Sequence, residues 1–294
     1  MSKSGSSITI GIFDGIHIGH RRLIAKAVSQ KPEDGEAVML TFEYPPEYYF
    51  KRNDKFHGMI YTGKKRKKLA LSLGIDRIEF LDFLEIKDMY ANEFVELLKK
   101  KYMATSVTVG FNFRFGKDKG GNTSFLSNRG KKLGFKTSII PPILYSGHKV
   151  SSTLIRHYLR NGEIGHANEI LCKPYSMCGI LSKTDDDDIF ILNRRNQTLL
   201  APCCGLYLAV NRNLDYFIVN IKDTGNSEHI EILNTSEKNT DIQNYKEFFL
   251  LETISLTNGK NRADFDKMKK EIDISKKLIE FWKNRNGWWK DEIQ

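Results

Sequence analysis

The stretch Gly11-Ile-Phe-Asp-Gly-Ile-His-Ile-Gly-His20 decides how the first half of the chain folds. It ends an apolar, β-branched segment that is typical of a strand, and it leads into a segment with helical spacing. A helix start offers free N–H donors and a positive dipole end, and both suit phosphate. Gly19 lets the backbone approach a ligand, and His17 and His20 can share one face of the first turn. The stretch therefore predicts a site where two imidazoles donate hydrogen bonds to phosphoryl oxygens and stabilise the charge of a leaving group.

Strand and helix patterns alternate on both sides of this stretch. Such alternation predicts right-handed βαβ units and a parallel sheet, with ligands bound beyond the carboxyl ends of the strands. We therefore expect an α/β, Rossmann-like domain in the first half of the chain. The strand patterns cover Ile8–Phe13, Ala37–Phe42, Arg77–Leu81, Ser106–Gly110 and Lys136–Ile140, and the helix patterns cover His20–Ser29, Thr62–Leu73 and Tyr90–Lys101.

The second half has a different pattern, because short strands separated by polar turns follow Pro174. This spacing predicts a small antiparallel β-barrel closed by one helix, about Ala263 to Trp282. We place the domain boundary between residues 173 and 174, which gives domains 1–173 and 174–294. The predicted strands are Tyr175–Leu181, Ile189–Leu192, Gly205–Val210, Tyr216–Ile221, Ile230–Leu233 and Phe248–Leu256.

Composition agrees with two globular domains in one cytoplasmic chain. The 294 residues are 40% hydrophobic and 28% charged, which excludes wholesale disorder. No apolar run reaches the length of a membrane span, and the start of the chain lacks the apolar stretch of a signal peptide. The four cysteines form no CxxC pair, so we expect reduced thiols and no zinc site.

The net charge of +10 favours polyanionic ligands such as nucleotides. A solvated helix start explains the run Lys64–Lys68 better than a nucleic-acid patch, because no aromatic residues interleave with it. We therefore expect small anionic substrates, no membrane partner and no nucleic-acid partner. No residue pattern assigns metal ligands or an oligomeric state.

Two further segments carry polar groups suited to a nucleotide. Ser151, Ser152 and Thr153 precede a helix, where they cap its donors or hold a phosphate, and Arg156 sits one turn later with a bidentate guanidinium. The segment Gly110-Phe-Asn-Phe-Arg-Phe-Gly116 ends a strand. Its three aromatic rings either clamp a flat ring or fold back onto the core.

These segments together resemble the prokaryotic FAD synthetase family, the usually bifunctional riboflavin kinase/FMN adenylyltransferases. Residues 11–20 match its G-x-F-D-G-x-H-x-G-H motif, and Thr41-Phe-Glu-Tyr-Pro-Pro46 resembles its T-F-x-P segment. Residues 110–116 match G-x-x-F-x-F-G, and residues 151–156 match S-S-T-x-I-R. The resemblance covers the chain from Ile8 to about Tyr175.

The resemblance implies a nucleotidyltransferase that converts ATP and FMN into FAD and pyrophosphate with Mg²⁺. It implies catalytic roles for His17, His20 and Arg156, phosphate contacts for the hydroxyls of residues 151–153, and a nucleotide contact for Asn112. Phe113 or Phe115, with Phe50, would pack against the isoalloxazine. The implied binding residues are Gly11, Phe13, Asp14, Gly19, Phe50, Asn112, Phe113, Phe115, Ser151, Ser152 and Thr153.

The second half resembles the riboflavin kinase module of the family only in outline. Pro174-Tyr175 resembles its opening strand, Gly205-Leu-Tyr207 its G-V-Y, and Glu231 falls on the strand that carries the catalytic Glu of the family. The glycine-rich segment G-R-x-L-G-F-P-T-A-N is missing, and an acidic run that ends at Asp188 stands in that region. We therefore predict a degenerate, structural kinase module.

Three alternatives remain at this point. The kinase chemistry survives with a diverged loop, so that the enzyme is bifunctional. The acceptor is instead pantetheine phosphate, nicotinamide mononucleotide or glycerol phosphate, because enzymes acting on these also carry HxGH motifs. Finally, the chain is a non-catalytic flavin- or RNA-binding regulator built on a decayed enzyme. Replacing His17 with Ala discriminates, because it should abolish turnover in an enzyme but scarcely change flavin binding in a binder.

Overall fold

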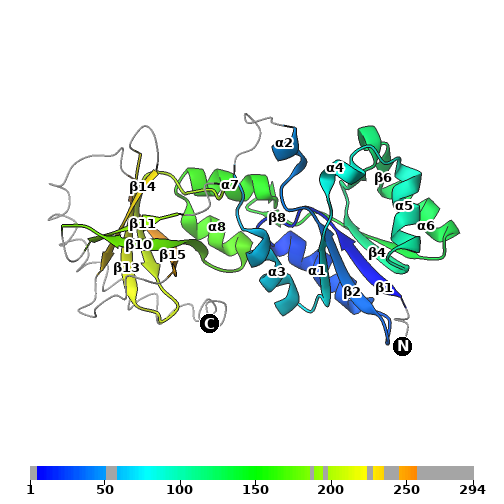
Figure 1. The fold of residues 1–294 in the computed structure, drawn as a ribbon, viewed down its shortest axis with the longest axis horizontal. Coiled ribbons are helices and arrows are strands. Elements are labelled where there is room, and N and C mark those ends of the chain that lie inside the picture. Colours follow the sequence, from blue (N-terminus) through cyan, green and yellow to red (C-terminus); the bar gives the residue numbers. More distant parts are fainter. Residues whose placement is uncertain are drawn as a thin grey trace. The chain divides into compact units, whose positions relative to one another are not determined.

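The computed structural model describes residues 5–50, 58–185, 189–194, 198–223, 228–234 and 245–256 (Figure 1). The predicted helix at 263–282 and the tryptophan pair at 288–289 lie outside these residues. The chain forms two compact units, Met1–Leu154 and Ile155–Gln294. The sequence placed the boundary 19 residues later, after Lys173. The two helices between these positions, α7 (Ser152–Arg160) and α8 (Ile164–Leu171), account for the difference.

The first unit is built on a five-stranded parallel sheet with the order β3-β2-β1-β4-β7, which confirms the predicted Rossmann-like α/β fold. The order places β1 at the centre, so the loop that follows it opens at the middle of the carboxyl edge. The strands are β1 (Ser6–Ile10), β2 (Glu36–Thr41), β3 (Arg77–Phe80), β4 (Ala104–Gly110) and β7 (Lys136–Ile140).

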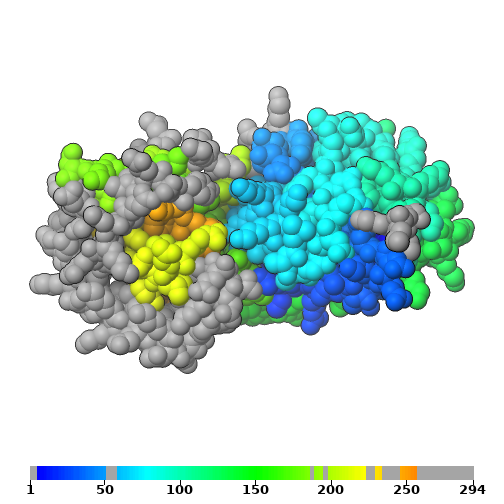
Figure 2. Space-filling view, turned by 60° about the horizontal axis from the view of Figure 1, so that its bottom comes forward, coloured from blue at the N-terminus to red at the C-terminus, as the bar shows by residue number. Residues whose placement is uncertain are grey.

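Helices connect these strands in the expected alternation. Thr62 caps the helix that begins at Gly63, since its Oγ1 accepts a hydrogen bond from the amide of Lys65 at 3.2 Å. The helices are α1 (Ile18–Ser29), α2 (Pro46–Tyr49), α3 (Gly63–Ser72), α4 (Phe83–Ile86), α5 (Ala91–Lys100) and α6 (Thr123–Lys132). The short elements are β5 (Arg114–Phe115), η1 (Lys117–Lys119), β6 (Gly121–Asn122), β8 (Leu144–Tyr145) and β9 (His148–Lys149). Figure 2 shows segments from the first 100 residues, in blue to cyan, covering one face of this unit.

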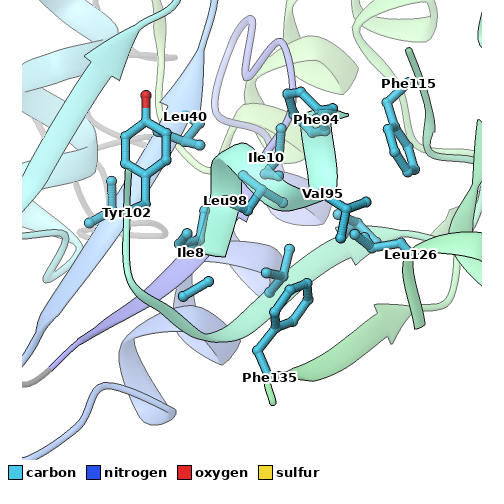
Figure 3. Packing of buried hydrophobic residues seen from close by; sticks show 14 of the residues in the cluster. Ile8, Ile10, Leu40, Phe94, Val95, Leu98, Tyr102, Phe115, Leu126 and Phe135 are labelled. Atoms are coloured by element: carbon cyan, nitrogen blue, oxygen red, sulfur yellow. The ribbon is translucent and has the colours of Figure 1, made fainter. Parts of the chain in front are cut away.

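A hydrophobic core joins α5 and α6 to the sheet. Phe94, Val95 and Leu98 lie on one face of α5 and pack with Ile8 and Ile10 of β1 (Figure 3). Their spacing along the helix matches its period, so a single face is buried. Removing these side chains from water fixes the sheet, and with it the loop that follows β1.

The second unit contains a closed antiparallel barrel with the strand order β10-β11-β14-β13-β12-β15, which confirms the predicted barrel. Tyr207, Val219 and Ile232 pair across three adjacent strands and are fully buried, so their shared face is apolar. Asn168 of α8 links the helix to this barrel, because its amide donates to the carbonyl of Leu250 at 2.9 Å. The strands are β10 (Tyr175–Lys183), β11 (Ile189–Asn193), β12 (Gly205–Val210), β13 (Tyr216–Asp223), β14 (Glu228–Asn234) and β15 (Tyr245–Leu256).

Candidate active site

The loop between β1 and α1 has a strained backbone. Phe13, Gly15 and Ile16 have φ values of 52°, 85° and 42°, in the left-handed region. Such angles are unfavourable for a bulky or β-branched side chain, and they persist only where the surroundings enforce them. Phe13 and Ile16 are fully buried, so the core holds this loop in its shape.

His17 and His20 form a stacked pair at the start of α1. His17 is the N-cap, and its Nδ1 accepts a hydrogen bond from the amide of His20 at 3.2 Å. The ring centroids lie 3.6 Å apart and the ring planes differ by 15°. Because Nδ1 of His17 accepts a hydrogen bond, the proton of the neutral ring is on Nε2, which can donate to a ligand. Nδ1 of His20 is buried and has no hydrogen-bond partner among the described residues.

Small and aromatic neighbours shape the space around the pair. The Phe13 ring lies against His20 with a centroid distance of 5.1 Å. A Cβ atom on Gly19 would stand 3.1 Å from Cε1 of His17, closer than a normal contact. Gly19 is therefore needed for the position of the His17 ring, a role that differs from the close ligand approach expected from the sequence. Gly11 faces the Phe13 ring in the same way, with 3.2 Å between its ideal Cβ position and Cε2.

Both imidazoles are neutral in this environment. Burial lowers the pKa of His17 from its ordinary 6.5 to about 3. Burial also lowers the pKa of His20 well below its usual range, and repulsion from His17 and from Arg66 lowers it further. The pair can therefore donate through Nε2–H without carrying a charge. A bound polyphosphate would oppose these effects and favour the protonated rings.

Asp14 holds a distant segment of backbone. Its carboxylate accepts hydrogen bonds from the amide of Ile60 at 3.0 and 3.1 Å and from the amide of Tyr61 at 3.1 Å. All three residues are buried. Asp14 thus connects the motif loop to the segment just before α3. The contact with a nucleotide that the resemblance implies stays a prediction.

Arg66 is the site residue that sequence reasoning missed. We read Lys64–Lys68 as a solvated helix start, but the side chain of Arg66 is fully buried, so that reading is wrong for this residue. The periodicity of α3 contains the signal, because Arg66 shares a buried face with Leu69 and Ala70. Its guanidinium reaches the ends of β1 and β2, as described below.

The segment 150–152 lies against the motif loop. Ser152 Oγ donates to the carbonyl oxygen of Asp14 at 2.9 Å, and Ser151 Oγ accepts from the amide of Leu154 at 3.2 Å. The structure thus brings Ser151 and Ser152 to the HxGH loop, across more than 130 residues of chain. Thr153 is exposed, and Arg156 lies in the second compact unit, so the joint clamp of Arg156 with the histidines stays a prediction.

The aromatic loop after β4 divides between surface and core. Asn112 is exposed, and Phe113 is half-buried and stacks on Phe115 with a centroid distance of 5.3 Å. Phe115 belongs to the core and also contacts Phe94. The alternative in which the loop folds back onto the core therefore holds for Phe115, with Phe113 packed over it, and the clamping of a flat ring stays a prediction.

Phe50 follows α2 and is 57% exposed. Its ring meets Phe83 edge to face at 5.4 Å. Tyr49 stacks on the same phenylalanine at 5.0 Å, and Tyr44 stacks on Tyr48 at 4.1 Å. The carboxyl end of β2 therefore carries a cluster of aromatic rings that the sequence analysis represented by Phe50 alone.

Searches for metal and membrane features give negative results over the residues that the structure describes. There, no three His, Cys, Asp or Glu side chains converge as a metal site. No helix in the same residues has the length and apolar character needed to cross a membrane.

Comparison with known proteins places the chain in a family. A family model described as FAD synthetase matches residues 1–154, which is more than half of the chain. The bifunctional riboflavin kinase/FMN adenylyltransferase of Buchnera aphidicola subsp. Schizaphis graminum is 31% identical over 180 residues, or 60% of this chain and 58% of that protein. The protein of the same name from Buchnera aphidicola subsp. Acyrthosiphon pisum is 29% identical over 246 residues, covering 80% of this chain and 74% of the relative.

The FAD synthetase of Listeria monocytogenes serovar 1/2a is 27% identical over 175 residues, which cover 59% of this chain and 71% of the relative. A crystal structure titled Macrolide-efflux Protein from Streptococcus pneumoniae is similar with a TM-score of 0.81 over 94% of this chain and 95% of that one. At 21% identity this likeness shows a shared fold and nothing more. The family model and the motif geometry together show that the chain belongs to the FAD synthetase family.

Proposed function

We propose that the first unit is an FMN adenylyltransferase that transfers AMP from ATP to FMN. The observation that carries the proposal is the stacked pair of neutral imidazoles at the N-terminus of α1, with the hydroxyl of Ser152 hydrogen-bonded to Asp14 in the loop before them. Donors of this kind, fixed at a helix start, bind phosphates and stabilise charge without reorganising. The bifunctional relatives and the Listeria FAD synthetase support FMN as the acceptor.

The chemistry requires orientation and charge stabilisation. An oxygen of the FMN phosphate attacks the α-phosphorus of ATP, and the bond from that phosphorus to the bridging oxygen breaks. The electron pair leaves with pyrophosphate, and the new P–O bond completes FAD. His17 and His20 donate through Nε2–H to the triphosphate as negative charge builds on the leaving group. Ser152, Thr153 and Arg156 hold phosphate oxygens from the other side in this proposal.

The flavin and the base are assigned to the aromatic segments. We assign the nucleotide contact to Asn112, which is exposed at the carboxyl end of β4. We assign the isoalloxazine to Phe113 and Phe50, because Phe115 is committed to the core. Gly11 and Phe13 act by shaping the loop that carries the histidines.

The resemblance implies Mg²⁺ with ATP, and the described residues contain no cluster of three side chains that would hold the ion without the substrate. The Asp14 carboxylate is engaged by backbone amides, and no acidic cluster of three lies elsewhere in the ranges described. Mg²⁺ keeps water ligands and binds phosphate oxygens readily. The ion would therefore arrive with the triphosphate, and we route no step through it.

We propose that the barrel no longer phosphorylates riboflavin. Glu231, on the strand where the family carries its catalytic Glu, is held by two neighbours in β13. Lys222 Nζ stands 2.6 Å from one carboxylate oxygen, and Asn220 Nδ2 stands 2.9 Å from the other. A carboxylate engaged on both oxygens is a poor general base. The bifunctional relatives favour the alternative, a surviving kinase, so the assay below tests both reactions.

We place the reaction in the cytoplasm. No disulfide joins the four cysteines, which lie among the described residues, and this agrees with a reducing compartment. ATP and FMN are the small-molecule partners in the proposal, and no nucleic-acid partner enters it.

One chromatographic experiment tests these proposals. The protein is incubated with ATP and Mg²⁺ and with either FMN or riboflavin, and the flavins are separated. We expect FAD from FMN and no product from riboflavin. FMN or FAD in the riboflavin tube would overturn the degenerate-kinase proposal, and no FAD in the FMN tube would overturn the adenylyltransferase proposal. Flavin binding by a chain without turnover would then favour the non-catalytic regulator.

A further inference from the structure

Arg66 is a buried cation whose hydrogen bonds go to the ends of two neighbouring strands. Nη1 donates to the carbonyl of Ile12 at 3.0 Å and to that of Phe42 at 2.8 Å. Nη2 donates to the carbonyl of Glu43 at 2.6 Å. Ile12 belongs to the loop after β1, and Phe42 and Glu43 follow β2. One planar group therefore fixes the two carboxyl ends that flank the motif loop.

Stability alone does not explain a charge in this place. Taking a guanidinium out of water costs several kcal/mol, and well-packed apolar side chains often replace buried ions without loss. The partners of Arg66 are carbonyls and the Thr41 hydroxyl, and its Nε has no partner among the described residues. A cation retained under these conditions indicates a task beyond stability. We call the N–H donors on the planar guanidinium of Arg66 its fork.

The surroundings of Arg66 are polar and charged. The carboxylates of Asp14 and Glu43 and the phenols of Tyr44 and Tyr49 act on its charge. Arg66 in turn contributes to the lowered pKa of His20, but burial and then His17 lower that pKa more. The hydrogen bonds of the guanidinium are therefore what connects Arg66 to the motif loop.

We propose that Arg66 is the positioning residue of the adenylyl-transfer site. Its fork holds the ends of β1 and β2, so that the motif loop keeps its strained shape and the stacked histidines keep their place at the start of α1. The proposal rests on the adenylyltransferase function for its kinetic part.

Two substitutions separate the fork from the charge. Arg66→Lys keeps the charge but offers a compact ammonium that cannot reach both strand ends with the same geometry. Arg66→Gln removes the charge and keeps an amide donor. Arg77→Gln is the matched control, because Arg77 bridges Glu36 at 2.6 Å and Glu79 at 3.0 Å at the amino ends of β2 and β3. It removes an arginine of β3 whose carboxylate partners lie away from the motif loop.

The experiment measures kcat and KM for ATP of each variant at a temperature where it is folded, and records the histidine ring resonances by NMR without substrate. For Arg66→Lys and Arg66→Gln we expect a KM about tenfold higher and shifted ring resonances of His17 and His20, because both variants lose the fork. The Arg77 variant should show neither change.

Several results would overturn the proposal. Wild-type KM and wild-type His17 and His20 resonances in a folded Arg66 variant refute the role of the fork, and an equal change in the Arg77 variant does the same. If Arg66→Gln does not fold, Arg66→Lys alone decides. If the wild-type protein makes no FAD, the adenylyltransferase proposal fails, while the ring resonances still decide whether Arg66 holds the histidine pair in place.

Discussion

Replacing Asp14 separates a structural role from a ligand-binding role. The resemblance to FAD synthetases implies a substrate contact for this residue, but its carboxylate accepts hydrogen bonds from the amides of Ile60 and Tyr61. Asp14→Ala leaves these two buried amides without an acceptor and removes a negative charge that faces Arg66. Each unsatisfied amide costs about 1–3 kcal/mol, and the uncompensated charge adds to that.

The expected loss is therefore about 3–5 kcal/mol, or about 10 °C in the melting temperature of a unit of this size. Asp14→Asn keeps one acceptor oxygen and should lose about half as much. Asp76→Ala is the matched control, since Asp76 accepts from the amide of Ala37 at 2.8 Å but its side chain is 40% exposed. Water can replace that lost partner, so we expect a cost of about 1 kcal/mol.

Urea unfolding followed by circular dichroism gives the free energies, and titration with ATP and with FMN gives the affinities. The reasoning is refuted if Asp14→Ala costs no more than Asp76→Ala while the affinity for either substrate falls tenfold. That outcome would mean that Asp14 meets the ligand, as the resemblance implies, and that its backbone contacts are incidental. A large loss of stability in Asp14→Ala, with near-wild-type affinity in the milder Asp14→Asn, would support the structural role.

Four further outcomes follow from the site and the barrel. His17→Ala should lower kcat for FAD formation about 10²–10³-fold and leave flavin binding unchanged, as stopped assays and fluorescence titration would measure; an equal loss of both would contradict a role at the phosphates. Because burial lowers the pKa of His17 to about 3, the unfolded chain takes up the proton first as the pH falls, so His17 should lower the free energy of unfolding by about 2 kcal/mol from pH 7 to pH 5, and His20 should add to this drop. His17→Gln should reduce the drop by about 2 kcal/mol in urea titrations, and an unchanged slope would show that the ring is already protonated or exposed. Gly19→Ala should change stability by less than about 1 kcal/mol, since better helix propensity offsets crowding, yet reduce kcat/KM about tenfold because the new Cβ displaces the His17 ring. Glu231→Gln should leave FAD formation from FMN within about twofold of wild type, and a larger loss would tie the barrel to the transfer reaction.

Local patterns in the sequence were sufficient to predict the main strands and helices and the two fold types. Alternating strand and helix signals predicted the parallel sheet, and short strands after Pro174 predicted the barrel, because burial of one face imposes a period on each element. The predicted strand Ala37–Phe42 differs from β2 by one residue at each end. The HxGH spacing likewise placed His17 and His20 on one helical turn, where they are found stacked.

The tertiary structure alone decided what the charged and aromatic residues near the site do. Arg66 stands in a run of basic residues, and only the packing of α3 shows that it points inward to the ends of β1 and β2. Asp14 meets amides 46 and 47 residues away, and Phe115 enters the core while Phe113 covers it. Spacing along the chain reports only neighbours within a few residues. The partner of a buried charge depends on which distant segments meet, and that is set by the assembled sheet.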